Sequence, residues 1–253
     1  MDYFVAKESV VRKIWGSADT ILFVFAGASA EFALNKAVDW LYFTGRLPAD
    51  PLARLFSTVA YAQDIVFAEE TRAFAAIDKI TAIHKGVEKQ RGMQIPMWAY
   101  RDVLFMLVDY SIRAFELLER KLSAAEKEEA YTVFYRIGVR MGIEELPATY
   151  THWLVMRAQY LQQHLVCSSF TTHLHRQYKK HLGLLRYQLL KQVQILVTPA
   201  VVRRLLKRGN MPLLWPVVQL YKLTRHIRLD GMVKNAILPP AYKLQVQKLN
   251  IIT

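Results

Sequence analysis

The sequence is poor in cysteine, glycine and proline. Cys167 is the only cysteine in 253 residues, which excludes an internal disulfide, a CxxC redox pair and a cysteine zinc site, and fits a reducing compartment. Glycine and proline contribute 10 and 9 residues, whereas hydrophobic residues make up 53% of the chain. This composition argues against a disordered or fibrous protein and predicts a folded core, in one large domain or two small ones.

Long apolar runs are also absent. The segment TILFVFAGASA fills only 11 positions between Asp19 and Glu31, and GNMPLLWPVVQLY only 13 between Arg208 and Lys222, whereas a membrane-spanning helix needs about 20 mostly apolar residues. The amino-terminal stretch MDYFVAKESVVRKIW lacks the continuous apolar segment of a secretory signal. We therefore expect a cytoplasmic protein that does not cross a membrane but can lie peripherally on its inner face.

Acidic residues are almost missing from the carboxyl-terminal part. Residues 151–253 hold 16 Lys and Arg against one acidic residue, whereas residues 1–150 hold 18 against 20. A one-sided excess of this kind indicates an anionic partner, which could be lipid, nucleic acid or an acidic protein. No zinc finger, RRM signature or clear helix-turn-helix accompanies the charge, so nucleic acid is the least favoured of the three.

A membrane surface is one explanation of the stretch 199–229, which interleaves basic and apolar residues. Trp215 and Tyr221 suit the headgroup level of a bilayer, and Leu213 suits its apolar part. The alternative, left open here, is a helix packed on the core with a solvated basic side. The basic residues expected to face an anionic membrane are Arg203, Arg204, Lys207, Arg208, Lys222, Arg225 and Arg228.

Alternating strand patterns are missing, and the long periodic segments are rich in good helix formers, so we predict an all-α protein. Asp50 before Pro51 is a helix cap followed by proline at the first helical position, and Ser123 with Glu126 forms a capping box. We expect a single domain, with a helical core over 1–165 and a basic helical part over 166–253 packed on it. Helices are predicted near 8–26, 29–44, 51–62, 65–90, 100–121, 123–141, 148–166, 174–196, 199–208 and 212–229.

One histidine lies on the apolar face of the helix predicted over 65–90. Ile80 precedes His84 by four residues and Ile77 by seven, and Val87 follows it by three, so these side chains share one face. An unpaired polar ring there is costly. His84 must therefore find a hydrogen bond, as an ordinary core histidine does, or a metal.

The preceding predicted helix carries Arg54, Thr58 and Tyr61 at intervals of four and three residues, which places them on one face. Arg54 is either an ordinary surface arginine or faces, with Thr58, a pocket that His84 also faces across a helical hairpin. The other histidines show no HExxH spacing. Three of them are expected to be solvated within a basic segment rather than metal ligands: His173, His175 and His181.

The stretch DPLARLFSTVAYAQDIVFAEETRAFAAIDKITAIHKGVE resembles the rubber oxygenase/mycophenolate-pathway oxygenase family. Arg54 and Thr58 match its Arg-x-x-x-Thr pair, and His84 with Val87 matches its His-x-x-Val element about thirty residues on. LVDYSIRAFE at 107–116 and YRIGVRMGIEELPATY at 135–150 are also similar to the family. The resemblance covers roughly residues 10–165.

The resemblance implies a globin-like helical bundle that holds haem b, with His84 as the iron ligand and an open side for O2. Ile77, Ile80 and Val87 would line the cofactor. Arg54 and Thr58 would act on bound oxygen and substrate, and the reaction implied is oxidative cleavage of an isoprenoid carbon–carbon double bond. The expected partners are O2 and a hydrophobic or prenyl-chain substrate.

The chain also departs from the family pattern. Ser57 stands where rubber oxygenases carry a lysine, and Gly27 to Ser29 stand where the family has Ala-His-Pro. The family's Trp-Val-His element is replaced by residues Val103 to Phe105. These differences leave a second hypothesis open, a non-catalytic haem- or lipid-binding protein of the same fold. If His84 is only a core histidine, a basic helical scaffold without a cofactor remains as the third.

Overall fold

The computed structural model describes residues 2–45, 49–209, 211–225 and 251. Within these ranges the chain is built from α-helices, with two isolated β-bridges and no strand, so the all-α prediction is confirmed. The helices are α1 (Val10–Trp15), α2 (Ala18–Phe32), α3 (Val38–Phe43), α5 (Pro51–Val66), α6 (Glu70–Arg91), α7 (Met97–Leu118), α8 (Ala124–Arg140), α9 (Tyr150–Gln163), α10 (Ser169–Val197), α11 (Ala200–Leu205) and α12 (Trp215–Arg225).

Capping residues set several of the helix boundaries. The Asp50 carboxylate accepts a hydrogen bond from the Ala53 amide at 3.0 Å, and Pro51 occupies the first position of α5. Ser123 and Glu126 form the predicted capping box at the start of α8. Because each of these side chains satisfies an amide that has no partner within its helix, the start of each helix could be predicted from the sequence.

The amino-terminal boundaries differ from the prediction. The helix expected over 8–26 is two helices, because the chain bends at Gly16 and Ser17 caps α2. The break expected between 26 and 29 does not occur, and α2 runs on to Phe32. Gly27 sits in the middle of α2 because a Cβ there would lie 2.2 Å from a ring carbon of Tyr110, so this glycine permits a close helix approach instead of ending a helix.

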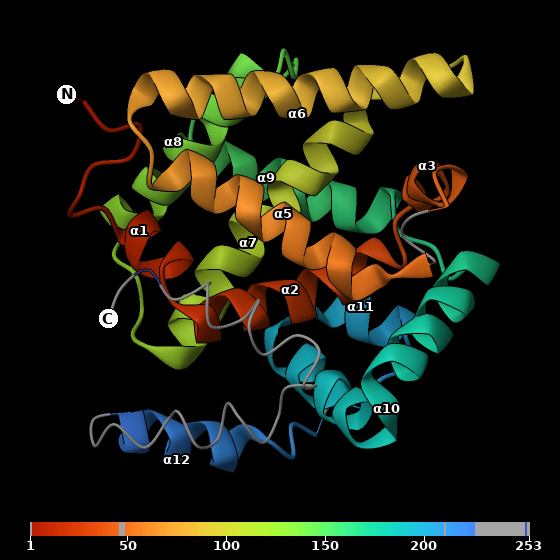
Figure 1. Cartoon of the computed structure of the whole chain (residues 1–253). Helices are drawn as coiled ribbons and strands as arrows, with labels where there is room; N and C mark the ends of the chain where they lie inside the picture. The colour runs from red at the N-terminus through yellow and green to blue at the C-terminus, as the bar shows by residue number, and fades with distance from the viewer. Residues whose placement is uncertain (1, 46–48, 210, 226–250, 252–253) are drawn as a thin grey trace.

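The core lies around α2 and α7, which pack against each other along their length and are covered by α1, α8 and α9. Figure 1 shows α6 lying across one side of the molecule above α5, with α10, α11 and α12 on the opposite side. α10 packs against α2, α5 and α7. No helix in the described ranges is long and apolar enough to cross a membrane.

A buried ion-pair network joins three of these helices. Arg157 of α9 donates to both carboxylate oxygens of Glu31 in α2 at 2.6 Å, and to Asp109 in α7 at 3.0 and 3.1 Å. The Tyr110 hydroxyl donates to Glu31 at 2.8 Å. All four side chains are buried. Because every charge has a bonded counter-charge, the network fixes the relative register of α2, α7 and α9.

Candidate functional site

The helical hairpin α5–α6 brings the predicted site residues together. Only three residues separate the two helices, so they run antiparallel and residues equally far from the turn lie opposite each other. Arg54 is 12 residues before the end of α5 and His84 is 14 residues after the start of α6. At 1.5 Å per residue both positions are about 20 Å from the turn, at the open end of the hairpin.

His84 is half-buried, and its environment disfavours a positive charge. Burial lowers its pKa, and the nearby positive charge of Arg54 lowers the pKa further, with Glu88 acting in the opposite direction. The imidazole is therefore neutral at pH 7, which is the state that ligates a metal. The influence of Arg54 also supports the face-to-face arrangement that the sequence left open.

The His84 ring has one buried nitrogen without a regular hydrogen bond, as His175 and His181 also do. Its Nδ1 atom is buried and makes no hydrogen bond with any described group. The carbonyl of Ile80, one helical turn earlier, acts on the ring as a backbone hydrogen-bond acceptor and raises the pKa, although its contact with Nδ1 falls outside regular hydrogen-bond geometry. Buried polar groups usually make regular hydrogen bonds. His84 is thus a neutral, half-buried imidazole whose Nδ1 atom lacks a regular hydrogen bond.

Tyr100 of α7 fixes the orientation of this ring. Its ring meets the His84 ring edge to face, with centroids 5.3 Å apart. The Tyr100 hydroxyl donates to Glu88 at 3.1 Å, and Glu88 also accepts the Ile95 amide at 2.9 Å. Burial, together with Glu88, raises the pKa of Tyr100. The sequence interpretation missed Tyr100 and Glu88, since Tyr100 is on the next helix and no spacing connects it to His84.

The predicted apolar neighbours of His84 divide between two packing regions. Ile77 is fully buried in the main core, and Ile80 is half-buried against the same core. Val87 instead packs on a small cluster that includes Trp40 of α3 and Trp98 of α7. The apolar face of α6 therefore packs on the protein as predicted. His84 lies on this face between Ile80, which packs on the main core, and Val87, which packs on the cluster around Trp40 and Trp98.

Arg54 and Thr58 lie half-buried on α5. The Thr58 hydroxyl donates to the carbonyl of Arg54 at 3.1 Å, and the Arg54 guanidinium donates to the Ser57 hydroxyl at 3.2 Å. The Ser57 hydroxyl in turn donates to the Arg54 carbonyl at 2.8 Å. These bonds hold the three polar side chains close to the helix, with the guanidinium as the cationic group on this part of α5.

A second histidine lies near the aromatic cluster. His164, at the end of α9, has its Nδ1 atom 2.9 Å from the carboxylate of Asp102, which also accepts a bond from Asn35 at 2.7 Å. Burial raises the pKa of Asp102. The His164 ring lies 4.6 Å from that of Trp98. Unlike His84, this histidine has a protein partner, so its position is explained by the fold.

The three carboxyl-terminal histidines contradict the sequence prediction, since all of them are half-buried rather than solvated. His173 bonds Tyr42 and Gln177, and the Nε2 atom of His181 is buried without a hydrogen-bond partner. His175 is not solvated: its Nε2 atom is buried without a hydrogen-bond partner, and burial with nearby Arg208 and Lys191 lowers its pKa to about 4. The side chain faces Tyr187 and Arg208 because α10 folds back on itself at Gly183. No group of three or more His, Cys, Asp or Glu side chains that could hold a metal ion is found in the described ranges.

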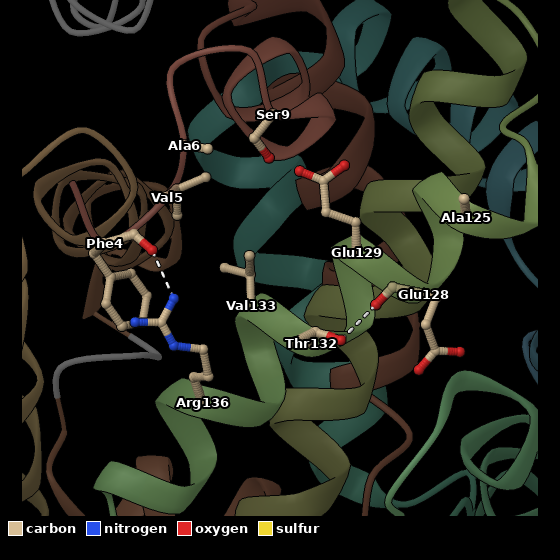
Figure 2. A pocket seen from close by; sticks show the side chains of 10 residues that line it. All are labelled: Phe4, Val5, Ala6, Ser9, Ala125, Glu128, Glu129, Thr132, Val133 and Arg136. Atoms are coloured by element: carbon tan, nitrogen blue, oxygen red, sulfur yellow. Dashed lines mark hydrogen bonds between the residues drawn. The ribbon is translucent and has the colours of Figure 1, made fainter. Parts of the chain in front are cut away.

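A surface pocket of about 470 Å³ lies away from these residues, between the amino-terminal segment and α8 (Figure 2). Glu128, Glu129 and Arg136 supply its charged groups. The guanidinium of Arg136 bonds the Phe4 carbonyl at 2.8 Å, as Figure 2 shows. The pocket contains no histidine or cysteine, so it offers no ligand for haem iron.

The chain matches one family model, described as the catalytic domain of the ER-bound oxygenase mpaB/B′/rubber oxygenase family, over residues 13–229. No curated protein and no solved structure matches it. The matched range contains the whole α5–α6 hairpin, with Arg54, Thr58 and His84 at its open end. The chain therefore belongs to the mpaB/rubber oxygenase catalytic-domain family.

Proposed function

We propose that this protein binds haem b through His84 and uses it to oxidise a hydrophobic, isoprenoid-like substrate, by oxidative cleavage of a carbon–carbon double bond. Membership of an oxygenase family supports the reaction class. The observation that carries the cofactor assignment is the state of His84, whose buried Nδ1 has no hydrogen-bond partner. Haem would supply the chemistry that activates O2, which protein side chains alone do not provide.

His84 fits the role of a single protein ligand to iron. A haem iron needs one neutral imidazole and leaves its other side open, and the lowered pKa of His84 keeps this ring neutral. The edge-to-face contact with Tyr100 limits rotation of the ring. Ile80 and Val87, on adjacent turns of the same helix, would offer apolar surface on either side of the ligand.

Arg54 would interact with molecules that enter the site next to the cofactor. Its guanidinium is always charged and can donate several hydrogen bonds, so it would orient and stabilise a polar or negatively charged group that enters the site. Thr58 has its proton engaged with the backbone. We expect Thr58 to contribute shape and an acceptor lone pair rather than a proton.

One observation favours the second hypothesis, a non-catalytic haem- or lipid-binding protein. Ser57 replaces the lysine of rubber oxygenases, and its hydroxyl is occupied with Arg54 on both sides, as donor and as acceptor. This position therefore cannot supply a second cationic side chain. Oxygen consumption with a prenylated test substrate separates the two hypotheses, because only the oxygenase consumes O2 in proportion to the substrate cleaved.

The first test is the haem content of the protein purified from haem-supplemented cells. We expect stoichiometric haem in the wild type and in His164→Ala, and none in His84→Ala. If His84→Ala keeps its haem and His164→Ala loses it, His164 is the iron ligand and the assignment of His84 is refuted. Arg54→Gln should keep haem and lower the rate of O2 consumption. Loss of haem from Arg54→Gln would instead make Arg54 a residue that holds the cofactor.

The proposal also includes a peripheral location on the inner face of a membrane, where an isoprenoid-like substrate would be dissolved. Two of the basic residues predicted to face lipid are turned toward the protein: Arg203 donates to the Thr198 carbonyl, and Arg208 contacts Gln194 at 3.1 Å. Arg204 and Lys207 are exposed. Arg228 lies outside the described residues, as does the side chain of Arg225. Tyr221 was expected at the headgroups but bonds Asp19 of α2.

A further inference from the structure

The five most exposed large apolar side chains among the described residues lie in one part of the chain. Leu184 and Leu185 of α10 are 61% and 83% exposed, and Met211, Leu213 and Leu220 are 74%, 66% and 61% exposed. Single exposed apolar residues are normal on a protein surface. A group of five between residues 184 and 220 is what a surface for an apolar partner or a membrane would show.

The first half of this surface is a corner in α10. Gly183 has φ 74° and ψ 171°, a backbone conformation that glycine adopts without strain, and it breaks the helix into two arms. The next two residues, Leu184 and Leu185, directly follow the bend and are exposed. Lys179 and Lys180, one turn before the corner, are exposed as well.

The second half is α12 and the residues just before it. Leu214, Val218 and Tyr221, spaced by four and three, face the protein: Val218 is buried and the Tyr221 hydroxyl bonds Asp19. Leu213, Val217 and Leu220 follow the same spacing one residue earlier and are exposed. The helix thus has two apolar stripes and only one of them is covered.

The two halves lie on the same side of the molecule. The Leu213 amide donates to the side chain of Gln192 in the second arm of α10 at 3.2 Å. Figure 1 shows the corner of α10 and the helix α12 along the lower edge, on the opposite side from α6. We call these residues the apolar edge: Leu184, Leu185, Met211, Leu213, Trp215, Val217 and Leu220.

Cations outnumber carboxylates around the apolar edge, although Asp19 accepts a hydrogen bond from Tyr221 of α12 and Asp50 lies near His181 of α10. Asp230 is the only acidic residue after position 150 and lies outside the described residues. Burial and the neighbouring Arg208 and Lys179 lower the pKa of Lys191, and burial lowers that of Arg208. Lys191 has cationic neighbours in Arg208 and Lys179, so an external anion would relieve their repulsion.

We propose that the apolar edge inserts into the surface of an anionic lipid bilayer, with the surrounding lysines and arginines contacting the headgroups. Charge and apolar exposure together select this occupant, because an anionic bilayer offers both charged headgroups and an apolar phase, whereas nucleic acid offers only charge and an apolar protein surface offers only the second. The surface differs from the one expected from the sequence: the corner of α10 joins it, and Tyr221 leaves it. The proposal does not depend on haem binding at His84, which lies on the other side of the molecule.

The test is co-sedimentation of the full chain with vesicles of phosphatidylcholine alone and of phosphatidylcholine mixed with phosphatidylserine. The perturbed variant is Leu184→Ser/Leu185→Ser. The matched control is Leu154→Ser/Val155→Ser, which changes two adjacent exposed apolar residues of α9. Circular dichroism confirms that both variants are folded, and haem content provides a separate measure that neither substitution should change.

We expect the wild type and the α9 control to bind the phosphatidylserine vesicles, and to bind them more weakly at high salt. The α10 variant should bind at least about tenfold more weakly, because the burial of two leucine side chains contributes a binding free energy of at least this size. Equal binding by both variants would overturn the proposal. So would binding of the wild type that is indifferent to phosphatidylserine and salt. A dimer in solution that the α10 substitutions dissociate would assign the apolar edge to a second copy instead.

Discussion

Replacing His84 by leucine should make the cofactor-free protein more stable while it abolishes haem binding. In the structure the Nδ1 atom of His84 is buried and has no hydrogen-bond partner. An unsatisfied buried polar group of this kind costs about 1–3 kcal/mol. The nearby carbonyl of Ile80 and the partial exposure of the ring place His84 at the lower end of this range. Leucine has a similar length and no polar atom, so His84→Leu should raise the free energy of unfolding by about 1 kcal/mol.

The assay is urea denaturation of the cofactor-free protein at pH 7.5, where His84 is neutral, followed by measurement of haem uptake. His173→Leu is the matched control, since His173 is also half-buried on a helix but has both ring nitrogens engaged, with the Tyr42 hydroxyl at 2.9 Å and Gln177 at 3.2 Å. Removing those bonds should lower the free energy of unfolding by about 1 kcal/mol. If His84→Leu destabilises the protein as much as His173→Leu does, then His84 is an ordinary structural histidine and the reasoning fails.

Three further predictions concern the ion-pair network, the titration of His175 and the contact between α2 and α7. Arg157→Leu leaves the buried carboxylate of Glu31 without a counter-charge and leaves Asp109 paired with Arg113 alone, and should lower the free energy of unfolding by about 3–5 kcal/mol. Arg113→Leu, at the exposed end of the same network, should cost less than about 1 kcal/mol. Similar values for the two variants in urea denaturation would contradict the network. The pKa of His175 is lowered to about 4, so the folded protein takes up its proton less readily than the unfolded chain, and stability should fall as pH drops from about 6.5 to 4. His175→Gln should flatten this part of the stability profile, and an unchanged profile would show that His175 titrates normally. Gly27→Ala places a methyl group against the ring of Tyr110, whose hydroxyl is bonded to Glu31. It should lower the free energy of unfolding by about 1–3 kcal/mol and so lower the midpoint of thermal unfolding. An unchanged midpoint would show that α2 and α7 can move apart without cost.

The sequence by itself determined the helical class and the local geometry of the hairpin that carries the site. Helix periodicity placed His84 with Ile77 and Ile80 on one face, and the Asp50–Pro51 cap set the start of α5. These features depend on residues within a few positions of each other, so their spacing in the sequence is their spacing in space. The resemblance to the oxygenase family rested on the same local order of residues, and the family match agrees with it.

Only the tertiary structure decided which residues from distant parts of the chain meet. Tyr100 contacts His84 because α7 packs beside the end of α6, and His175 is buried because α10 bends at Gly183. The same bend and the docking of Tyr221 on Asp19 settle which apolar side chains of the basic part remain exposed. Helical periodicity predicts that a face is apolar, but whether protein covers that face depends on how the helices pack together, which no local pattern records.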